Sequence, residues 1–444
     1  MNMTEDKLQK IVSLCKRRGF VFPSSEIYGG IGAAYDYGPY GCQLKKNIKD
    51  IWWKTSVERR SDVVGLDAAL ITQQEVFEAS GHLDGFNDVL VDCRECKFRF
   101  RLDHLEQISD KEYKCQQCGA VINTDVCPPR KFNLMLKTEL GVVEGSMKPG
   151  YLRPETAQGI FVNFDNVQNS MHKKLPFGIA QIGKSFRNEV TTKSFIFRTR
   201  EFEQMEIEYF TSPEDADEHY AAWVDTRYRW YTDELGISIG NLSKREHARD
   251  ELAHYAKCCT DIEYAFPFGV SELEGIAHRG DYDLSSHARH SGAKLEYHDP
   301  YTDKRFVPYV IEPSAGVDRT LLAVLCDAYH EEEVNGRTRV VMKFKHSVAP
   351  VKAAIFPLLK NRSEIVERAG LLYNDLSRYF NVSYDDTGNI GKLYRRQDEV
   401  GTPFCITVDP ESIEDGKVTV RDRDTMAQER VSIGGLKAYI EDKI

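Results

Sequence analysis

The sequence of 444 residues lacks any apolar run near the roughly 20 residues that a membrane-spanning helix needs. It also lacks an excess of positive charge. The formal net charge is −10, so broad, non-specific coating of nucleic acid is not expected, although a local basic face would suffice for one RNA ligand. Residues 1–10 are polar and charged, without the apolar core of a secretory signal, so we expect a cytoplasmic protein with no membrane association.

Cysteine is sparse, with eleven residues in the chain. Four of them form two tight pairs, Cys93/Cys96 and Cys115/Cys118, with eighteen residues between the pairs. The cytosol keeps thiols reduced, and this spacing is typical of a four-thiolate zinc ribbon. The intervening chain is too polar to form a core unaided, so zinc would supply folding free energy. The alternative is four cysteines without a metal, and Cys127 is either a stray or a substitute ligand.

Hydrophobic residues make up 41% and charged residues 29% of the chain, a balance typical of globular proteins, and the length predicts two or three domains. Apolar spacing in the first part predicts a helix at 43–59, a strand at 62–71, strands at 178–187 and 200–210, a helix at 214–235, a strand at 309–312 and a helix at 316–329. After a boundary near 344–350, the pattern predicts strands at 351–357, 382–385 and 404–408 that alternate with helices at 363–379 and 390–399. Such alternation indicates a separate three-layer α/β domain.

The most informative motif is Ser185-Phe-Arg-Asn-Glu189, followed after a polar loop by Phe197-Arg-Thr-Arg-Glu-Phe202. Two strands joined by a loop would place Arg187, Glu189 and Phe202 on one surface. There a forked guanidinium suits phosphate oxygens, and the glutamate accepts from an adenine amino group. The ring offers a stacking face worth about 1–3 kcal/mol. The alternative for so short a pattern is an ordinary salt-bridged hairpin.

A second motif, Glu312-Pro-Ser-Ala-Gly-Val-Asp-Arg319, precedes an apolar helix. Gly316 permits close approach of the backbone, and Arg319 near the helix start would meet phosphates. The two motifs, in this order, resemble motifs 2 and 3 of class II aminoacyl-tRNA synthetases. The alternative, a surface arginine that faces solvent, would explain one such segment but not two in the right order. The helix at 43–59 and the strand at 62–71 resemble motif 1 without its usual proline. This resemblance implies a homodimer.

Longer strings resemble glycyl-tRNA synthetases and span most of the chain. They are residues 37–41, 80–82, 85–88, 153–159, 200–206, 272–277 and 312–316. The resemblance implies an α+β catalytic domain on an antiparallel sheet (1–344), with a zinc-ribbon-like insertion (92–120) and a helical insertion (213–265). A C-terminal α/β anticodon-binding domain (345–444) would follow, with Lys392, Arg395 and Arg396 beside Tyr394 suited to phosphates and unstacked bases.

The resemblance implies a glycine–tRNA ligase that forms glycyl-adenylate and pyrophosphate from glycine and ATP, then transfers glycine to the 3′ end of tRNA(Gly). ATP with Mg²⁺ and a structural Zn²⁺ would be its cofactors. The catalytic residues would be Arg187 and Arg319, and Glu272 would be a magnesium ligand. The residues expected to bind ATP are Arg187, Asn188, Glu189, Phe197, Arg198, Thr199, Arg200, Glu201, Phe202, Glu272, Leu273, Gly316, Val317, Asp318 and Arg319. Those expected to bind glycine are Arg101, Glu155, Phe202, Glu203, Gln204, Met205, Glu206, Glu312, Pro313, Ser314, Ala315 and Gly316.

Glycine offers no side chain to grip, so a site must hold its ammonium group and leave no room beyond it. From the resemblance, Glu155, Glu206 and Glu312 surround the ammonium, with Ser314 beside it and Arg101 nearby. One extra methyl is worth only about 1–3 kcal/mol in an apolar pocket, so exclusion of alanine requires steric closure. Met205 departs from the alanine usual in the family, but on a strand it would point away from Glu206.

Three alternatives remain open at this point. The first is a serine or proline enzyme of the same subclass, which a panel of amino acids in a pyrophosphate-exchange assay distinguishes. A non-catalytic synthetase-like protein, such as a polymerase accessory factor, has no reason to keep Arg187, Glu189, Phe202 and Arg319 together. A zinc-ribbon nucleic-acid binder leaves most of the chain unexplained. The loop at 190–196, with Thr191, Thr192 and Lys193, is expected to contact the acceptor end of tRNA.

Overall fold

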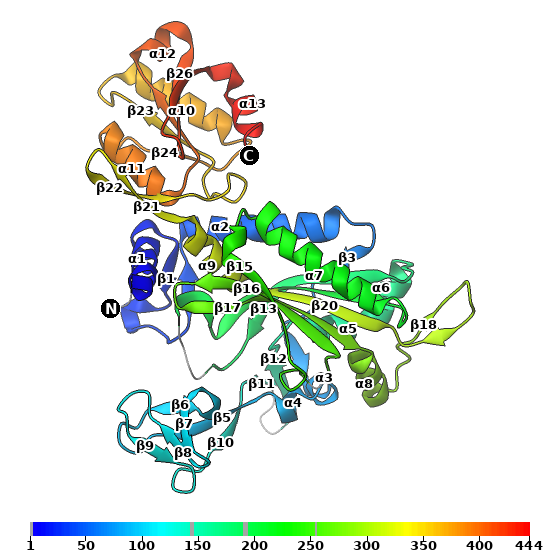
Figure 1. The fold of residues 1–444 in the computed structure, drawn as a ribbon. Helices are drawn as coiled ribbons and strands as arrows, with labels where there is room; N and C mark the ends of the chain where they lie inside the picture. The colour runs from blue at the N-terminus through cyan, green and yellow to red at the C-terminus, as the bar shows by residue number, and fades with distance from the viewer. Residues whose placement is uncertain (1–2, 143–145, 190–193, 254) are drawn as a thin grey trace.

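The computed structural model describes residues 3–142, 146–189, 194–253 and 255–444, so the tip of the loop expected to contact tRNA, 190–193, lies outside the described residues. A central body built on a large sheet carries a small β-rich module at one end and a C-terminal domain at the other (Figure 1). Among the described residues, no helix combines the length and apolar character required to cross a bilayer.

The central sheet has seven strands in the order β15-β16-β17-β20-β14-β13-β3. Their bounds are β15 Leu242–Glu246, β16 Cys258–Phe266, β17 Gly269–Gly280, β20 Tyr309–Gly316, β14 Glu201–Thr211, β13 Phe177–Phe186 and β3 Val63–Gly65. All neighbouring pairs are antiparallel except β3 with β13, which are parallel. The expected antiparallel catalytic sheet is therefore confirmed.

One face of this sheet packs against three helices, α2 (Pro39–Trp53), α7 (Ala216–Asp233) and α9 (Val317–Ala328). In α2 the buried residues Leu44, Ile48 and Trp52 recur every four positions, so they form one stripe toward the core. Helix α9 is buried almost throughout. Strand residues such as Met205 and Ala315 point into the same core. Because side chains alternate along a strand, their neighbours face the opposite side of the sheet.

Two sequence expectations differ from the observed structure. The apolar run at 62–71 forms not one strand but two, β3 and β4 (Ile71–Gln73), which belong to different sheets. Hydrophobic periodicity alone does not reveal where a chain leaves one sheet for another. The segment 213–265, expected to be a helical insertion, contains α7 but then enters the central sheet as β15 and β16. Buried Ile262, Tyr264 and Phe266 alternate along β16, as a strand requires.

The β-rich module consists of two three-stranded sheets, in the orders β10-β5-β6 and β7-β8-β9. The strands are β5 Asn87–Asp92, β6 Arg99–Arg101, β7 Glu106–Ser109, β8 Glu112–Lys114, β9 Val121–Asn123 and β10 Arg130–Asn133. Its small buried core cluster consists of Val91, Leu105, Ile122 and the thiols Cys93 and Cys115. A core this small contributes little folding free energy, so a module of this kind needs an additional cross-link.

The C-terminal domain has a five-stranded sheet in the order β24-β23-β25-β26-β27, in which β23 lies parallel to both neighbours. The strands are β23 Ala353–Pro357, β24 Val382–Tyr384, β25 Phe404–Val408, β26 Lys417–Asp422 and β27 Gln428–Ser432. The helices are α10 Ser363–Leu376, α11 Ile390–Val400, α12 Pro410–Asp415 and α13 Leu436–Glu441. The predicted α/β character is confirmed. The side chain of Asn389 caps α11 by accepting from the Lys392 amide at 3.0 Å.

The remaining elements connect these parts. They are α1 Met3–Arg18, β1 Val21–Pro23, β2 Tyr35–Tyr37, α3 Gln74–Ala79, α4 His82–Gly85, β11 Leu136–Leu140, β12 Lys148–Leu152, α5 Ala157–Phe161, α6 Phe164–Ser170, α8 Tyr282–Ser291, β18 Tyr297–His298, β19 Arg305–Phe306, β21 Tyr329–Val334 and β22 Arg337–Met342. The hairpin of β21 and β22 follows α9 directly and lies against α11 of the C-terminal domain (Figure 1).

Candidate active site

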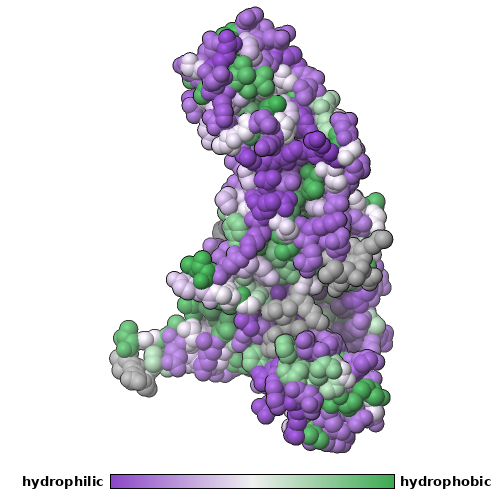
Figure 2. Space-filling model, turned by 90° about the vertical axis from the view of Figure 1, so that its left-hand side faces the viewer, coloured by the Kyte–Doolittle hydropathy of each residue, from purple (hydrophilic) through white to green (hydrophobic). Residues whose placement is uncertain are grey.

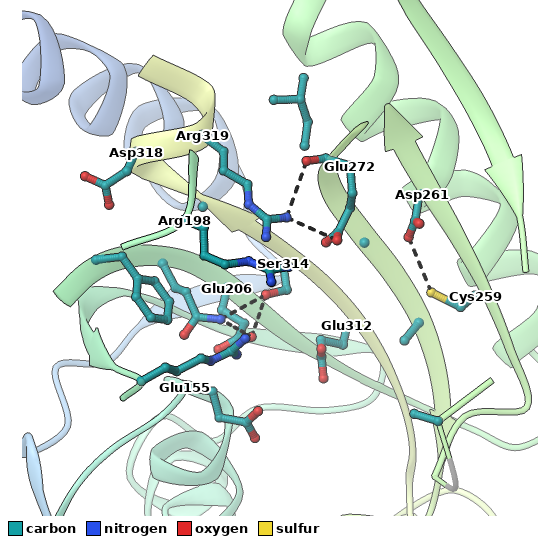
Figure 3. A pocket seen from close by; sticks show the side chains of 18 of the residues that line it. Glu155, Arg198, Glu206, Cys259, Asp261, Glu272, Glu312, Ser314, Asp318 and Arg319 are labelled. Atoms are coloured by element: carbon teal, nitrogen blue, oxygen red, sulfur yellow. Dashed lines mark hydrogen bonds and ion pairs between the residues drawn. The ribbon is translucent and has the colours of Figure 1, made fainter. Parts of the chain in front are cut away.

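A cavity of about 340 Å³ opens on the face of the central sheet opposite the helical core. Its floor is one row of register partners on four neighbouring strands, Asp261, Gly275, Ser314 and Glu206. Segments far apart in sequence therefore contribute side chains to one line across the sheet, and Figure 3 shows several of these side chains converging. The site exists because the register aligns residues of the same face.

One end of the cavity is cationic, because Arg187, Arg198 and Arg319 all line it. Arg319, in the first turn of α9, donates to the backbone carbonyl of Phe197 at 3.3 Å, and its guanidinium carbon lies 4.5 Å from the centroid of that ring. Its Nη1 is 3.1 Å from a carboxylate oxygen of Glu272, and this ion pair lowers the pKa of Glu272. Three guanidinium groups facing one partly exposed carboxylate favour a polyanionic ligand.

Arg187 is fixed by a hydrogen bond from Nε to the carbonyl of Pro154 at 3.1 Å. Its guanidinium carbon lies 5.2 Å from the centroids of both Phe86 and Phe202. A phosphate-binding group and an aromatic stacking face are thus adjacent. Nearby, Glu189 lines the cavity, and its Oε2 is buried without a hydrogen-bond partner among the described residues. A buried acceptor without a donor in the protein is expected where a bound ligand supplies the donor.

The other end of the cavity is anionic and nearly closed. Glu206 accepts from the Ser314 hydroxyl at 2.6 Å and from the Thr156 amide at 3.1 Å, and it also contacts the Thr156 hydroxyl. Glu312 forms an ion pair with Arg279, whose remaining nitrogens bind Asp283 at 2.7 and 2.8 Å. Only 2% of Glu206 and 8% of Glu312 are exposed.

Glu155 completes this end of the cavity through contacts with His82, at 3.3 Å, and with the Gln158 amide, at 3.0 Å. Burial opposes its ionisation, yet His82 lowers the pKa of this carboxyl overall. Burial raises the pKa of Glu312 to about 8 in spite of Arg279. Burial also raises the pKa of Glu206. Carboxylates that repel one another in so enclosed a space favour a small cationic ligand.

Glu208 lies behind these groups on β14 and is fully buried. Neither of its carboxylate oxygens has a hydrogen-bond partner among the described residues, and oxygens of Glu206, Glu208 and Glu312 all lie within 4.8 Å of one another. Burial raises the pKa of Glu208 well above its usual value, with Glu312 adding to the effect. Glu208 therefore stays protonated. The negative charge at this end comes first from Glu155, whose pKa is lowered, and from Glu206 and Glu312 once they ionise.

The structure brings most of the expected ligand-binding residues together. The expected residues that line the cavity are Glu155, Arg187, Glu189, Phe197, Arg198, Thr199, Phe202, Gln204, Glu206, Glu272, Leu273, Glu312, Ser314, Gly316, Asp318 and Arg319. Those that do not line it are Arg101, Asn188, Arg200, Glu201, Glu203, Met205, Pro313, Ala315 and Val317. Strand alternation explains why most of the second group do not line the cavity, because consecutive residues of a strand point to opposite faces of the sheet.

Several of these displaced residues have structural contacts instead. Glu203 forms ion pairs with Lys45 and Lys49, both at 2.8 Å, on the helix side of the sheet. Arg200 donates to the carbonyl of Glu189 at 3.1 Å and so supports the loop that carries this acceptor. Arg101 lies on β6 in the cysteine module, where it pairs with Asp88 at 2.9 Å and Asp103 at 2.7 Å, away from the carboxylate end.

Other cavity residues were not expected from the sequence. The segment expected to be a helical insertion contributes four of them, His247, Tyr255, Cys259 and Asp261. The alternating apolar pattern of β16 is the sequence signal that indicates a strand there. Arg279 neutralises part of the charge at the carboxylate end. It was missed although it lies only two positions after the string at 272–277 that resembles the family. A lone arginine in a strand has no local pattern that distinguishes it from a surface residue.

The four paired cysteines converge in the β-rich module, with all four Sγ atoms within 4.8 Å of one another. The Sγ atoms of Cys93 and Cys118 are 3.7 Å apart, and those of Cys96 and Cys115 are 3.6 Å apart. This donor set and spacing fit a tetrahedral Zn²⁺, whose bonds to sulfur are about 2.3 Å long. Cys127 packs against the same small core but does not belong to this group of four.

Known proteins resemble this chain over its full length. Residues 144–328 match the family described as tRNA synthetase class II core domain (G, H, P, S and T), and residues 352–443 match the anticodon binding domain family. The glycine–tRNA ligase of Borreliella burgdorferi is 52% identical over 441 residues, covering 99% of this chain and 98% of that protein. The glycine–tRNA ligase of Caldanaerobacter subterraneus subsp. tengcongensis is 51% identical, covering 98% of both.

Among solved structures, prolyl-tRNA synthetase from Cryptosporidium parvum, in complex with L-proline and AMP, resembles this chain with a TM-score of 0.64. The match covers 97% of this chain and 76% of that chain at 15% sequence identity. Similarity at this level establishes a shared fold and nothing about the substrate.

Proposed function

This chain belongs to the glycine–tRNA ligase family, and from that premise we propose which of its residues bind ATP, glycine and tRNA. The enzyme activates glycine with ATP to glycyl-adenylate and pyrophosphate, then transfers glycine to the 3′ end of tRNA(Gly). The observation that carries the assignment of residues is the polarity of the cavity, which is cationic at one end and anionic at the other.

The nucleotide binds at the cationic end. Arg187 contacts the α-phosphate and the carboxylate of glycine, while Arg198 and Arg319 contact the outer phosphates. Adenine stacks on Phe202, and its amino group donates to the unpartnered oxygen of Glu189. Glu272 is the carboxylate that would hold Mg²⁺, which typically takes one or two carboxylates together with phosphate oxygens and neutralises their charge.

Glycine binds at the anionic end, where Glu206, Glu312 and Glu155 face its ammonium group and Ser314 lies beside Glu206. Glu206 and Glu312 are nearly buried, and we assign to this enclosed niche the exclusion of side chains larger than that of glycine. A hydrophobic pocket would distinguish glycine from alanine poorly, whereas a closed polar niche excludes the methyl group by steric overlap. The niche thus selects the smallest amino acid by charge and by lack of space.

The first step requires no general base, because the carboxylate of glycine is already a nucleophile. One carboxylate oxygen attacks the α-phosphorus, the bond to the bridging oxygen breaks, and pyrophosphate leaves. The chain contributes orientation and charge stabilisation through Arg187 and Arg319. In the second step a terminal ribose hydroxyl of tRNA attacks the carbonyl carbon of glycyl-adenylate, and AMP leaves with the bonding electrons.

The wider organisation follows from the same premise. We assign residues 1–344 to the catalytic domain and 345–444 to the domain that binds the anticodon of tRNA(Gly). The converging thiols support a structural Zn²⁺ in the module at 92–120. The likeness of residues 43–71 to motif 1 supports a homodimer, and tRNA charging places the enzyme in the cytoplasm.

The proposed function is tested by ATP–pyrophosphate exchange with glycine, alanine and serine as substrates. Exchange should depend on glycine, with alanine and serine at least about a hundredfold weaker in kcat/KM, the range that steric exclusion from a polar site provides. Arg187→Ala should lower glycine-dependent exchange by about 10²–10³, the usual cost of removing one preorganised donor. Lys184→Ala, an exposed change on β13, which ends one residue before Arg187, is the control. Equal exchange with alanine, or a fully active Arg187→Ala variant, would overturn the assignment.

A further inference from the structure

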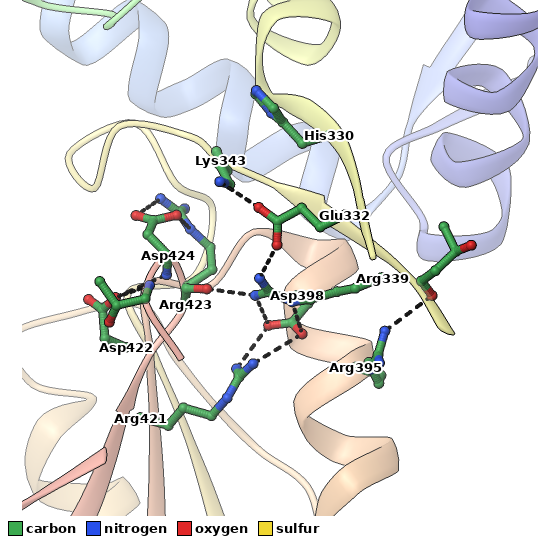
Figure 4. Close-up of polar contacts among 12 residues, drawn as sticks. His330, Glu332, Arg339, Lys343, Arg395, Asp398, Arg421, Asp422, Arg423 and Asp424 are labelled. Carbon is green, nitrogen blue, oxygen red and sulfur yellow. Dashed lines mark hydrogen bonds and ion pairs between the residues drawn. The ribbon is translucent and has the colours of Figure 1, made fainter. Parts of the chain in front are cut away.

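A buried cluster of charges joins the β21–β22 hairpin to the C-terminal domain, and the proposed function does not yet use it (Figure 4). Asp398, on α11, accepts from Nε and Nη2 of Arg339, both at 2.8 Å. Asp398 also accepts from Nη1 and Nη2 of Arg421, at 2.9 and 3.3 Å. The Arg339 and Asp398 side chains are each only 1% exposed, so one carboxylate is enclosed between two forked guanidinium groups.

Further hydrogen bonds extend this cluster beyond Asp398. Arg339 also donates to Glu332 at 2.7 Å and to the backbone carbonyl of Arg423 at 2.6 Å. Arg423 in turn donates to the carbonyls of Phe344, at 2.7 Å, and Gly401, at 2.9 Å. The cluster therefore crosses the boundary between the domains several times within a few residues, and it leaves no charge that a ligand would have to satisfy.

A buried ion pair of this kind is a poor source of stability, because the cost of removing two charges from water is close to the gain from pairing them. Two parallel hydrogen bonds between a planar guanidinium and a carboxylate instead fix both a distance and an angle. The outer surface around the junction is largely hydrophilic (Figure 2), while Phe344, Val348 and Ala349 are buried there in the core of the catalytic body. The forked contact adds a direction that apolar packing alone does not provide.

The position of the cluster relates it to both functional ends of the molecule. Helix α9 carries Arg319 in its first turn, at the ATP cavity, and ends at Ala328, where the chain continues directly as β21. Strand β22 then carries Arg339, which binds Asp398 near the end of α11. One continuous segment thus connects the phosphate-binding arginine to the helix that presents basic residues of the C-terminal domain.

We propose that Arg339, through Asp398, is a positioning residue for the tRNA-dependent step. It fixes the orientation of the anticodon-binding domain relative to the ATP cavity, so that a tRNA bound at its anticodon brings its 3′ end to the adenylate. This inference rests on the proposed function, since it requires both domains to bind the same tRNA. Every residue that lines the cavity lies between 155 and 319, so glycine activation should not depend on Arg339.

Arg339→Gln tests the proposal, because it removes the partner on the hairpin and leaves the Asp398–Arg421 pair intact inside the C-terminal domain. We expect glycine-dependent pyrophosphate exchange to stay within about twofold of wild type. Aminoacylation should lose about tenfold or more in kcat/KM for tRNA, mostly through KM, as expected when one charged, bidentate contact worth 1.4 kcal/mol or more is lost. Small-angle X-ray scattering should show a broader distribution of domain arrangements.

Arg337→Gln is the matched control, an exposed arginine two positions earlier on the same strand, and both of its activities should equal wild type. Arg339→Lys keeps the charge but loses the forked guanidinium. It should also impair aminoacylation without impairing exchange, but to a smaller extent. It replaces the glutamine variant if that variant does not fold. Unchanged aminoacylation in Arg339→Gln, or equal losses in exchange and aminoacylation, would overturn the proposal. Absence of glycine-dependent exchange in the wild-type enzyme would instead overturn the proposed function.

Discussion

Two buried clusters of charged side chains in this molecule differ in how completely their charges are satisfied. In the cluster between the domains, Asp398 accepts from Arg339 and Arg421, Glu332 accepts from Arg339, and Arg339 also donates to a backbone carbonyl. At the closed end of the cavity, several carboxylates share Arg279 as their buried guanidinium. One of these carboxyls, Glu208, has no hydrogen-bond partner among the described residues.

This difference distinguishes a cluster that fixes the structure from a cluster that binds a ligand. A network in which each donor and acceptor is paired specifies one geometry and has no capacity for a ligand. An enclosed cluster with surplus charge and unused acceptors is destabilising until a ligand of opposite charge binds, and so indicates a binding site. The predictions that follow test whether this distinction holds, from the largest expected effect to the smallest.

The largest effect is expected where surplus charge meets the substrate. Glu206→Gln should lower kcat/KM for glycine in pyrophosphate exchange by about 10- to 150-fold, because a charged hydrogen bond to the ammonium is worth about 1.5–3 kcal/mol. The melting temperature should remain equal or rise, since one of several repelling carboxylates is removed. Glu201→Gln, on the same strand but outside the cavity, is the control. A variant that is destabilised yet keeps its glycine KM would contradict the distinction.

The cysteine group is a third cluster with unused ligand atoms, so the same reasoning predicts a bound metal. Protein purified without chelator should contain about one equivalent of zinc by elemental analysis, and Cys96→Ser should lose most of it and expose the module to proteolysis. Cys127→Ser should retain zinc, because Cys127 lies outside the group of four. Less than about half an equivalent in the wild-type protein would count against the site.

The smallest effect concerns pH. The pKa of Glu312 is raised to about 8 in the folded protein, so this carboxyl keeps its proton at pH values where the unfolded chain has lost it. Its contribution to the free energy of unfolding therefore falls as pH rises from its ordinary pKa to about 8. Glycine needs the ionised form, so its KM should fall by about eightfold between pH 7 and 8.5. Glu312→Gln should abolish this dependence, and a flat profile in the wild-type enzyme would refute it.

The sequence predicted best those features that repeat locally. The helix at 214–235 corresponds to α7, the strand at 200–210 to β14, and the alternating pattern beyond residue 350 to the C-terminal sheet and its helices. These segments have strong periodicity and clear boundaries, so local pattern and tertiary structure agree. The two cysteine pairs likewise indicated a convergence that the structure contains.

The details that could not be predicted depend on strand alternation and register. Contiguous strings such as 203–206 and 312–316 were assigned to the ligand as units, yet Met205 and Ala315 point into the helical core while Glu206 and Ser314 face the cavity. Partners such as Arg279 and Asp261 enter the site only because the strands pair with one particular offset. No property of an isolated sequence window contains that offset.

The cavity floor at residues 261, 275, 314 and 206 has one further consequence. The backbone hydrogen bonds of the sheet do not depend on which side chains occupy these four positions. The side chains that contact the ligand can therefore change while the sheet stays the same. Gly275 illustrates the point, because a Cβ placed there would meet only Asp261 and Glu272, at 3.6 and 3.9 Å, which are ordinary contact distances. At Gly275, therefore, a side chain can be added to the cavity floor, and the shape of the binding site changed, without a backbone clash.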